Sequence, residues 1–244
     1  MHIVIQGAGR GLGLAFAHHA LSAGATNLYL TARNLQGSEG YRQLPPSEHV
    51  QWFNMDFLHS DQIASTGEAV LAAAPHIDRV IITAGVLHDG EIQPEKRVGA
   101  LSAEAMLHLY QVNAMGPALF LKSLWPALRR PHPVTAASLS ARVGSIADNQ
   151  LGGWYSYRAS KAALNQYMRT LSIELARYND KAKIITLHPG TVETDLSKPY
   201  RSRVAKGQLK SPAKSAGQLW SVLDQLSPDD TGGFFAYDGQ SIAF

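Results

Sequence analysis

Short apolar runs alternate with longer amphipathic stretches throughout the 244-residue chain. The apolar runs predict strands at residues 2–6, 27–31, 50–55, 78–82, within 131–139, and at 183–187 and 234–237. Apolar positions at helical spacing predict helices at residues 14–23, 61–74, 101–128, 152–171 and 213–226. Strands that are almost continuously apolar and alternate with helices are typical of a parallel sheet covered on both faces. The pattern therefore predicts an α/β fold with about seven strands.

Three segments lack both periodicities. Residues 34–49 are polar and rich in proline, and residues 86–100 are polar and turn-forming, so we expect two loops there. Residues 192–211 are charged with few large apolar side chains, which predicts a mobile lid. No internal repeat and no linker divides the sequence, so we expect a single domain over residues 1–244.

Composition narrows the class of protein. A content of 45% apolar and 17% charged residues is that of a globular protein with a sizeable core. The absence of cysteine excludes disulfides, thiolate metal sites and a cysteine nucleophile. No membrane-length apolar run or secretory signal is apparent, and the net charge is only +3, so we expect a cytoplasmic protein without membrane or nucleic-acid partners. The adjacent His18 and His19 have no acidic partner at ligand spacing, and no metal site is predicted.

The first predicted strand runs directly into a glycine-rich turn, residues 7–13, that opens a helix. Its spacing is G-x-x-x-G-x-G rather than the G-x-G-x-x-G of many dehydrogenases. Glycines let backbone N–H groups approach a pyrophosphate, and the helix N-terminus adds favourable partial charge. The turn therefore predicts a Rossmann-type, doubly wound domain in which a dinucleotide contacts Gly7, Gly9, Arg10, Gly11, Leu12 and Gly13.

The residues after the second and third strands indicate which dinucleotide binds. The second strand is followed by Ala32, Arg33 and Asn34, with no acid to hold a ribose 2′-hydroxyl. Arg33, with Arg10 nearby, suits a 2′-phosphate, so we predict NADP(H); the alternative is a solvent-exposed Arg33 and NAD. Asp56, which closes the third strand, is placed against the adenine amino group, and its neighbour Phe57 is included in the predicted site.

A candidate for acid–base chemistry lies in the helix predicted at residues 152–171. Tyr157 and Lys161 are four residues apart and share a helical face. A neighbouring cation lowers the pKa of a phenol, which suits proton exchange with an alcohol or carbonyl oxygen. Asn113, inside the helix predicted at residues 101–128, could hold a water next to the lysine.

In chain order these landmarks resemble the short-chain dehydrogenase/reductase family. The resemblance rests on the glycine turn, Asp56, Ala84-Gly85, Asn113, Tyr157-x-x-x-Lys161 and Pro189-Gly190-x-x-x-Thr194, and it covers nearly the whole chain. The stretch SARVGSIADNQLGGWYSYRASKAALN is also similar to the branch containing bacterial C-factor-type proteins and insect carbonyl reductases.

The resemblance implies specific roles. Tyr157 would exchange a proton with the substrate oxygen, Lys161 would lower its pKa and hold the nicotinamide ribose, and Asn113 would position a water. The cofactor site would extend over further residues: Ala84, Gly85, Pro189, Gly190, Thr191, Val192 and Thr194, the last near the carboxamide.

The activity implied is that of an NADP-dependent carbonyl reductase or alcohol dehydrogenase acting on a small-molecule carbonyl or alcohol. The family also implies a homodimer or homotetramer. The alternatives are an NAD(P)-binding signalling or regulatory protein of C-factor type with little turnover and, less favoured, an isomerase or dehydratase on the same fold.

Two positions depart from the family pattern. Thr83 stands where the family usually has asparagine before Ala84-Gly85, and we expect an effect on stability more than on activity. Ala141 stands where the family's catalytic serine is expected. The neighbouring Ser140 is our first candidate for orienting a substrate carbonyl, and Ser145 is the second.

Overall fold

The computed structural model describes residues 1–90, 92–205 and 207–244. Glu91, in the predicted loop 86–100, and Lys206, in the predicted lid, lie outside the described residues. In the described part of the chain, seven strands form one sheet in the order β3-β2-β1-β4-β5-β6-β7, with every neighbouring pair parallel. The strands are β1 (His2–Gln6), β2 (Asn27–Ala32), β3 (Val50–Asn54), β4 (Arg79–Ile82), β5 (Thr135–Leu139), β6 (Lys183–His188) and β7 (Phe234–Ala236).

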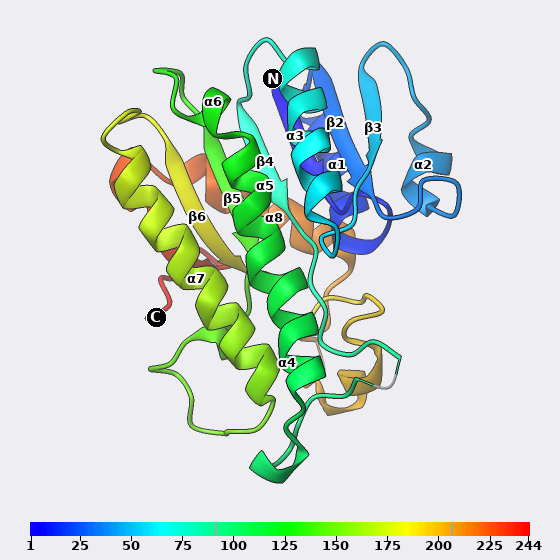
Figure 1. The fold of residues 1–244 in the computed structure, drawn as a ribbon, viewed down its shortest axis with the longest axis vertical. Helices are drawn as coiled ribbons and strands as arrows, with labels where there is room; N and C mark the ends of the chain where they lie inside the picture. The colour runs from blue at the N-terminus through cyan, green and yellow to red at the C-terminus, as the bar shows by residue number, and fades with distance from the viewer. Residues whose placement is uncertain (91, 206) are drawn as a thin grey trace.

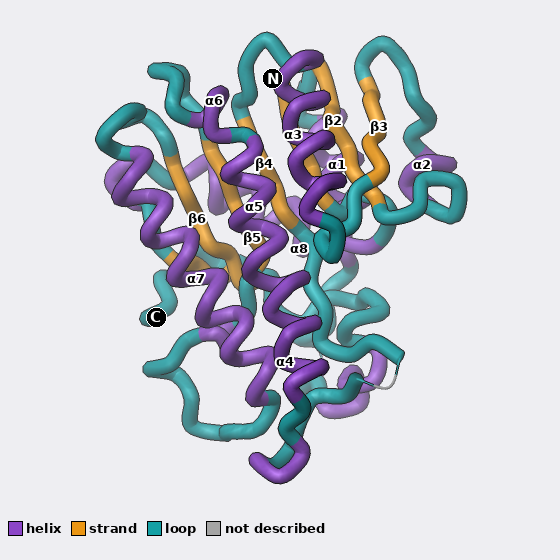
Figure 2. The backbone as a smooth tube through the Cα atoms, viewed as in Figure 1, coloured by secondary structure: helices purple, strands orange, loops and turns teal. Residues whose placement is uncertain are grey.

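Helices cover both faces of the sheet (Figure 1). One face carries α1 (Gly11–Ser22) and α8 (Pro212–Gln225), which pack against each other. The other carries α3 (Ser60–Ala73), α5 (Gly116–Ser123) and α7 (Tyr155–Leu175), with α4 (Ala103–Tyr110) continuing the line of α5 beyond the sheet (Figure 2). The predicted doubly wound α/β fold is therefore confirmed.

The sheet separates two hydrophobic clusters. Ile3, Ile5 and Leu30 face α1 and α8, whereas their strand neighbours Val4 and Tyr29 face α3 and α5. All five side chains are at most 1% exposed, because successive residues of a strand point to opposite faces and both faces are covered. This burial on two sides explains why the strands appear in the sequence as continuous rather than alternating apolar runs.

Three predicted segments differ in detail. The single helix expected at residues 101–128 is divided into α4, a π-helical turn (Gln111–Met115), α5 and α6 (Trp125–Leu128). The expected loop 34–49 contains α2 (Glu39–Gln43), because the Ser38 side chain caps the backbone N–H of Tyr41. The expected lid contains a 3₁₀ turn at Lys198–Arg203.

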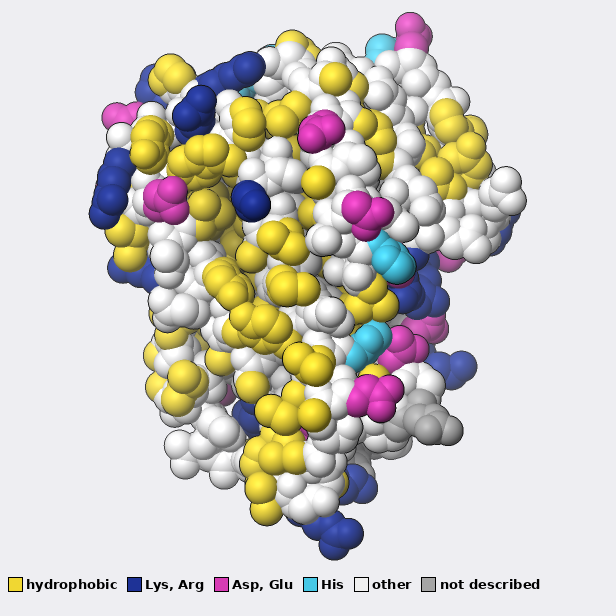
Figure 3. Space-filling model, viewed as in Figure 1, with side chains coloured by type: hydrophobic (Ala, Val, Ile, Leu, Met, Phe, Trp, Pro, Cys, Tyr) yellow, Lys and Arg dark blue, Asp and Glu magenta, His cyan; other side chains and the backbone are white. Residues whose placement is uncertain are grey.

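The outer surface of the α3–α5–α7 layer is notably apolar. Figure 3 shows apolar side chains running as a band over α4, α5 and α7. Among the exposed large apolar residues on these helices are Met106, Leu107, Tyr110, Tyr167 and Ile173. None of the helices in the described part of the chain combines the length and apolarity needed to cross a bilayer.

Candidate active site

The predicted site residues gather at the carboxyl ends of the strands, on both sides of the point where the strand order reverses. That point lies between β1 and β4, since the chain winds outward from β1 to β3 on one side and from β4 to β7 on the other. In open parallel sheets, ligands bind in the crevice at such a reversal. The segments that follow β1, β4, β5 and β6 therefore define the candidate site.

The glycine turn after β1 is packed too tightly for side chains. A Cβ on Gly7 would lie 2.6 Å from Thr83 Oγ1, and one on Gly13 would overlap the Gly7 carbonyl oxygen. Gly7 also has a φ of +83°, which side chains disfavour. Thr83 donates a hydrogen bond from its hydroxyl to the Gln6 carbonyl at 2.8 Å. Thr83 thus ties the end of β4 to this turn.

The other side of the turn faces the start of the predicted lid. A Cβ on Gly11 would lie 3.3 Å from Thr194 Cγ2, so the two segments touch there. Arg10 forms an exposed ion pair with Asp195 at 2.9 Å. The structure therefore brings together Gly11 and Thr194, which are far apart in sequence, around one crevice.

The polar end of the crevice is formed by β2 and α2. Arg33, directly after β2, is exposed to solvent. Gly9 packs against this segment, because a Cβ there would lie 3.0 Å from Ala32 Cβ and 3.1 Å from Ser38 Oγ. Ser38 donates a hydrogen bond to the Gly9 carbonyl at 3.1 Å. The contact between the turn and α2 was not predicted, because residues 34–49 show no helical periodicity.

Four of the predicted cofactor residues differ in how far their side chains are buried. Asp56 is half-buried at the end of β3, and its carboxylate accepts a hydrogen bond from the Leu58 N–H at 3.0 Å. The side chains of Leu12, Phe57 and Val192 are instead buried in the hydrophobic clusters. The burial of these three side chains leaves mainly their backbone groups available to a ligand.

Tyr157 and Lys161 share one face of α7, and both are buried. Lys161 Nζ lies 5.9 Å from the centre of the Tyr157 ring and donates a hydrogen bond to the Leu139 carbonyl at 2.9 Å. Burial lowers the pKa of Lys161 to about 7 and raises the pKa of Tyr157. The sequence predicts a tyrosine pKa lowered by the lysine, whereas in this structure burial shifts the tyrosine pKa upward.

Asn113 is completely buried inside the π-helical turn. Its side-chain oxygen accepts a hydrogen bond from the Val86 N–H at 2.7 Å, and its amide donates to the Val86 carbonyl at 2.8 Å. The amide also donates to Ser160 Oγ at 3.0 Å, on the helix that carries Lys161. A Cβ on Gly85 would lie 3.3 Å from Lys161 Nζ and 3.6 Å from Asn113 Oδ1, so these groups meet at the end of β4.

The two candidate serines have different surroundings. Ser140 is buried at the end of β5, and its hydroxyl has no hydrogen-bond partner among the described residues. Ser145 is also buried, but its hydroxyl accepts a hydrogen bond from the Asp148 N–H at 3.1 Å. A buried hydroxyl without a partner is costly, which favours a role for Ser140 toward a ligand.

An apolar wall surrounds the tyrosine. Tyr157 packs in a cluster with Leu87 and Leu109, against which Trp154, Leu196 and Tyr200 are partly buried. The rings of Trp154 and Tyr200 lie 5.1 Å apart, so the predicted lid touches the start of α7. This wall can accept an apolar substituent of a substrate.

A buried carboxylate that the sequence did not single out fixes the start of α7. Glu95 accepts hydrogen bonds from the backbone N–H of Ser156, at 3.2 Å, and from its hydroxyl. Glu95 is only 5% exposed, although it lies in the predicted loop 86–100. A separation of 61 residues from Ser156 gives no local sequence signal for this contact.

The loop after β6 completes the crevice. Gly190 has a φ of +74°, and the Pro189 carbonyl accepts a hydrogen bond from Ser215 Oγ at 3.2 Å. The Thr191 carbonyl accepts the N–H of Lys210 at 3.0 Å. Lys210, also not predicted, packs its ammonium on the Tyr237 ring, and burial lowers its pKa to about 8. The predicted segment 189–194 therefore leads from the end of β6 into the lid.

The parallel sheet, the glycine turn and the strand-end crevice define a Rossmann-type dinucleotide-binding protein. A model of the short chain dehydrogenase family matches residues 1–205. The chain therefore belongs to the short-chain dehydrogenase family and is an oxidoreductase of that class.

Individual relatives agree with the predicted branch. The chain is 34% identical over 145 residues to C-signal of Myxococcus xanthus, covering 59% of this chain and 82% of that protein. Carbonyl reductase Sniffer of D. melanogaster is 25% identical with a TM-score of 0.86, and the match covers 100% of this chain and 99% of that one. A carbonyl reductase from Pseudomonas aeruginosa PAO1, solved in complex with NADP, is 26% identical with a TM-score of 0.79 over 100% and 99% of the two chains.

Proposed function

We propose that this protein is an NADP(H)-dependent carbonyl reductase or alcohol dehydrogenase with a single catalytic domain over residues 1–244. The observation that carries the proposal is the buried Tyr157–Lys161 pair beside Gly85, Asn113 and Ser140 at the strand-reversal crevice. Buried titratable groups that share a cleft with an unpartnered hydroxyl are typical of catalytic sites.

The crevice fits a dinucleotide because the glycine turn forms a cradle that a Cβ would fill. The residues proposed to hold the cofactor are Gly7, Gly9, Arg10, Gly11, Leu12, Gly13, Arg33, Asp56, Phe57, Ala84, Gly85, Tyr157, Lys161, Pro189, Gly190, Thr191, Val192 and Thr194. The cofactor would supply the hydride, and the protein's own side chains position the substrate and move the proton.

Tyr157 is the proposed acid–base group. Its phenol is protonated at neutral pH and can give its proton to a carbonyl oxygen during reduction, although burial, by raising its pKa, makes it a weaker acid than a free tyrosine. Lys161, whose pKa is lowered to about 7, can shed or take up a proton near neutrality. Asn113 holds the Val86 backbone and Ser160, and so fixes the lysine relative to the end of β4.

The preference for NADP(H) rests on charge. Arg33 is exposed directly after β2, and neither it nor its neighbours Ala32 and Asn34 is an acid. Arg10 adds positive charge on the other side of the glycine turn, where it pairs with Asp195. The P. aeruginosa carbonyl reductase solved with NADP has the same fold. Ser140 is the proposed partner of the substrate carbonyl, since its hydroxyl is buried without a partner among the described residues.

The decisive experiment is NADPH oxidation by wild type and Tyr157→Phe against a panel of aldehydes, ketones and quinones. Removal of a general acid costs roughly 10²–10⁴ in rate, so we expect a loss of that size in kcat with nearly unchanged NADPH affinity. The matched control is Tyr155→Phe, because Tyr155 lies two residues away and is exposed. Turnover by Tyr157→Phe at the wild-type rate would overturn the proposal.

The likeness to C-signal supports a second candidate, a regulatory protein that responds to cofactor occupancy. Such a protein would bind NADPH but oxidise it with none of the substrates in the panel. Its biological effect would then survive Tyr157→Phe, whereas an effect that needs catalysis would be lost.

A further inference from the structure

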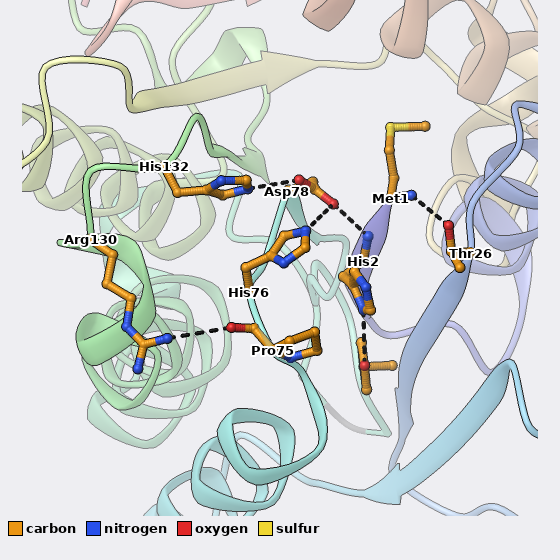
Figure 4. Close-up of polar contacts among 9 residues, drawn as sticks. Met1, His2, Thr26, Pro75, His76, Asp78, Arg130 and His132 are labelled. Atoms are coloured by element: carbon orange, nitrogen blue, oxygen red, sulfur yellow. Dashed lines mark hydrogen bonds and ion pairs between the residues drawn. The ribbon is translucent and has the colours of Figure 1, made fainter.

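Three side chains with metal-binding groups meet at the edge of the sheet opposite the candidate active site. His76 and Asp78 lie just before β4, and His132 lies just before β5 (Figure 4). Because β4 and β5 are parallel neighbours, the segments that precede them lie side by side at the amino ends of the strands. The candidate catalytic residues follow the carboxyl ends of the same strands, so the two sites are separate.

The distances within this cluster suit a small cation. Asp78 Oδ2 lies 3.4 Å from His76 Nε2, and Asp78 Oδ1 lies 2.8 Å from His132 Nε2. With one ligand atom taken from each residue, the three atoms lie within 4.8 Å of one another. A tetrahedral Zn²⁺ site with bonds of about 2.0–2.1 Å places its ligand atoms about 3.3 Å apart. The His76–Asp78 pair, through Oδ2, already has this separation, and the His132–Asp78 pair, through Oδ1, needs a shift of about 0.5 Å. The ligand nitrogens of the two imidazoles lie no more than 4.8 Å apart.

The cluster is open enough to the solvent to admit an ion. The three side chains are 41%, 22% and 37% exposed for His76, Asp78 and His132, so an ion can reach them and keep water as a further ligand.

Surrounding contacts hold the ligands in place. The His2 N–H donates to Asp78 Oδ2 at 2.6 Å, and the His2 ring packs edge-on against His76 at 4.6 Å. Asn179 donates from its amide to the His132 carbonyl at 2.9 Å. Partners of this kind, behind the direct ligands, orient a metal site.

We infer that His76, Asp78 and His132 form a binding site for a divalent transition-metal ion of the Zn²⁺ type. Two imidazoles and one carboxylate suit Zn²⁺ and exclude Mg²⁺ and Ca²⁺, which prefer oxygen ligands. Local sequence spacing could not show this site, because His132 is 54 residues from Asp78. A bound ion would join the segments before β4 and β5, stabilising the fold without contact with Tyr157 or Lys161.

The test is titration of the untagged full chain with Zn²⁺ by calorimetry, after chelation and removal of metal, in a buffer that does not bind metal. We expect one equivalent of Zn²⁺ to bind, excess Mg²⁺ not to compete, and Zn²⁺ to raise the Tm. Co²⁺ provides a second readout, since direct imidazole and carboxylate ligation intensifies its visible absorption.

One variant tests the site, and a second serves as its control. His132→Gln retains a donor for Asp78 but loses the imidazole, and we expect at least a tenfold loss of Zn²⁺ affinity and loss of the Tm increase. The control is His59→Gln, because His59 is exposed and makes no capping hydrogen bond with its side chain. Equal Zn²⁺ binding by wild type and His132→Gln, or no binding by wild type, would show that the cluster is only a hydrogen-bonded network. Circular dichroism of each variant verifies folding, and His76→Gln gives the same comparison should His132→Gln fail to fold.

Discussion

Arg33 is the residue on which cofactor choice depends most directly. It is exposed directly after β2, at the polar end of the crevice. A hydrogen bond to a charged group is worth about 1.5–3 kcal/mol, so Arg33→Ala should raise the KM for NADPH roughly 10–100-fold. The KM for NADH should hardly change, because NADH lacks the 2′-phosphate.

Steady-state kinetics with both cofactors test this prediction. Arg177→Ala is the control, since Arg177 is exposed near the end of α7 and far from β2. Equal KM values for NADH and NADPH in the wild type would contradict the assignment of NADP(H).

Lys161 should make stability depend on pH. Its ordinary pKa is 10.5, and burial lowers the value to about 7 in the folded protein. Between these two values the unfolded chain binds the additional proton, so the contribution of Lys161 to the free energy of unfolding rises with pH from about 7 toward 10.5. At pH 6 the folded protein must hold a buried ammonium, which Lys161→Met removes.

We therefore expect the stability of Lys161→Met relative to wild type to be roughly 2–3 kcal/mol greater at pH 6 than at pH 9. Urea unfolding at the two pH values measures this difference, and other titrating groups cancel in the comparison. The control Lys181→Met, at an exposed lysine, should show no such dependence. A difference independent of pH would mean that Lys161 keeps its ordinary pKa.

Some residues of the candidate site could be predicted from the sequence, and others could not. The four-residue spacing of Tyr157 and Lys161 was sufficient to predict that they share one helix face. The position of the glycine turn in the sequence was sufficient to place it directly after β1. The direction of the Tyr157 pKa was not accessible, because burial depends on Leu87, Leu109 and other residues far along the chain. Glu95 and Lys210 were missed for the same reason.

At the scale of single elements, α7 depends on a residue outside it. Glu95 accepts hydrogen bonds from Ser156 at the start of the helix, where a negative charge also complements the helix dipole. Tyr157 is the next residue, so a loosened first turn would misplace its hydroxyl.

We expect Glu95→Gln to lower the free energy of unfolding by about 1–3 kcal/mol and to lower kcat, with the KM for NADPH unchanged. Thermal unfolding and kinetics give the two readouts, and the exposed Glu68→Gln on α3 is the control. A loss of stability without any change in kcat would show that Glu95 supports the loop alone.

The elements themselves were predicted to different degrees. The strands could be located because both faces of the sheet are covered, which makes each strand a continuous apolar run. The division of residues 101–128 into several helices could not be predicted. The spacing of apolar residues does not reveal the one extra residue that a π turn contains. That turn follows from the hydrogen bonds of Asn113 to Val86, a contact across 27 residues.

At the scale of the whole molecule, the apolar band over α4, α5 and α7 is the surface best suited to self-association. A hollow of about 350 Å³ lies between α5 and α7, lined by residues that include Leu121, Trp125 and Leu171. Tyr167, also in its lining, is 41% exposed, and Ile173 is 52% exposed. Large exposed apolar surfaces mark interaction sites.

We expect a homodimer, or a homotetramer containing it, built through this band. Sedimentation of the Leu107→Asp, Ile173→Asp double variant should give monomers, because burying a charge in an apolar interface is costly. Ile146→Asp, at an exposed position outside these helices, is the control and should leave assembly unchanged. A wild-type chain that sediments as a monomer at micromolar concentration would exclude the prediction.

The order of the strands across the sheet is another property of the whole molecule, and it cannot be predicted from the spacing of apolar residues. The glycine turn supplied that information, since a strand, glycine turn and helix at the start of the chain identify the doubly wound topology.

The π turn at Gln111–Met115 has a consequence for how this chain can vary in length. The turn holds one residue more than a regular helical turn, so removing one residue would close it into regular helix. Asn113 would then lose the wide turn from which its side chain reaches Val86. A single missing residue in this turn should therefore lower the stability of the fold and the activity together, which thermal unfolding and kinetics would show.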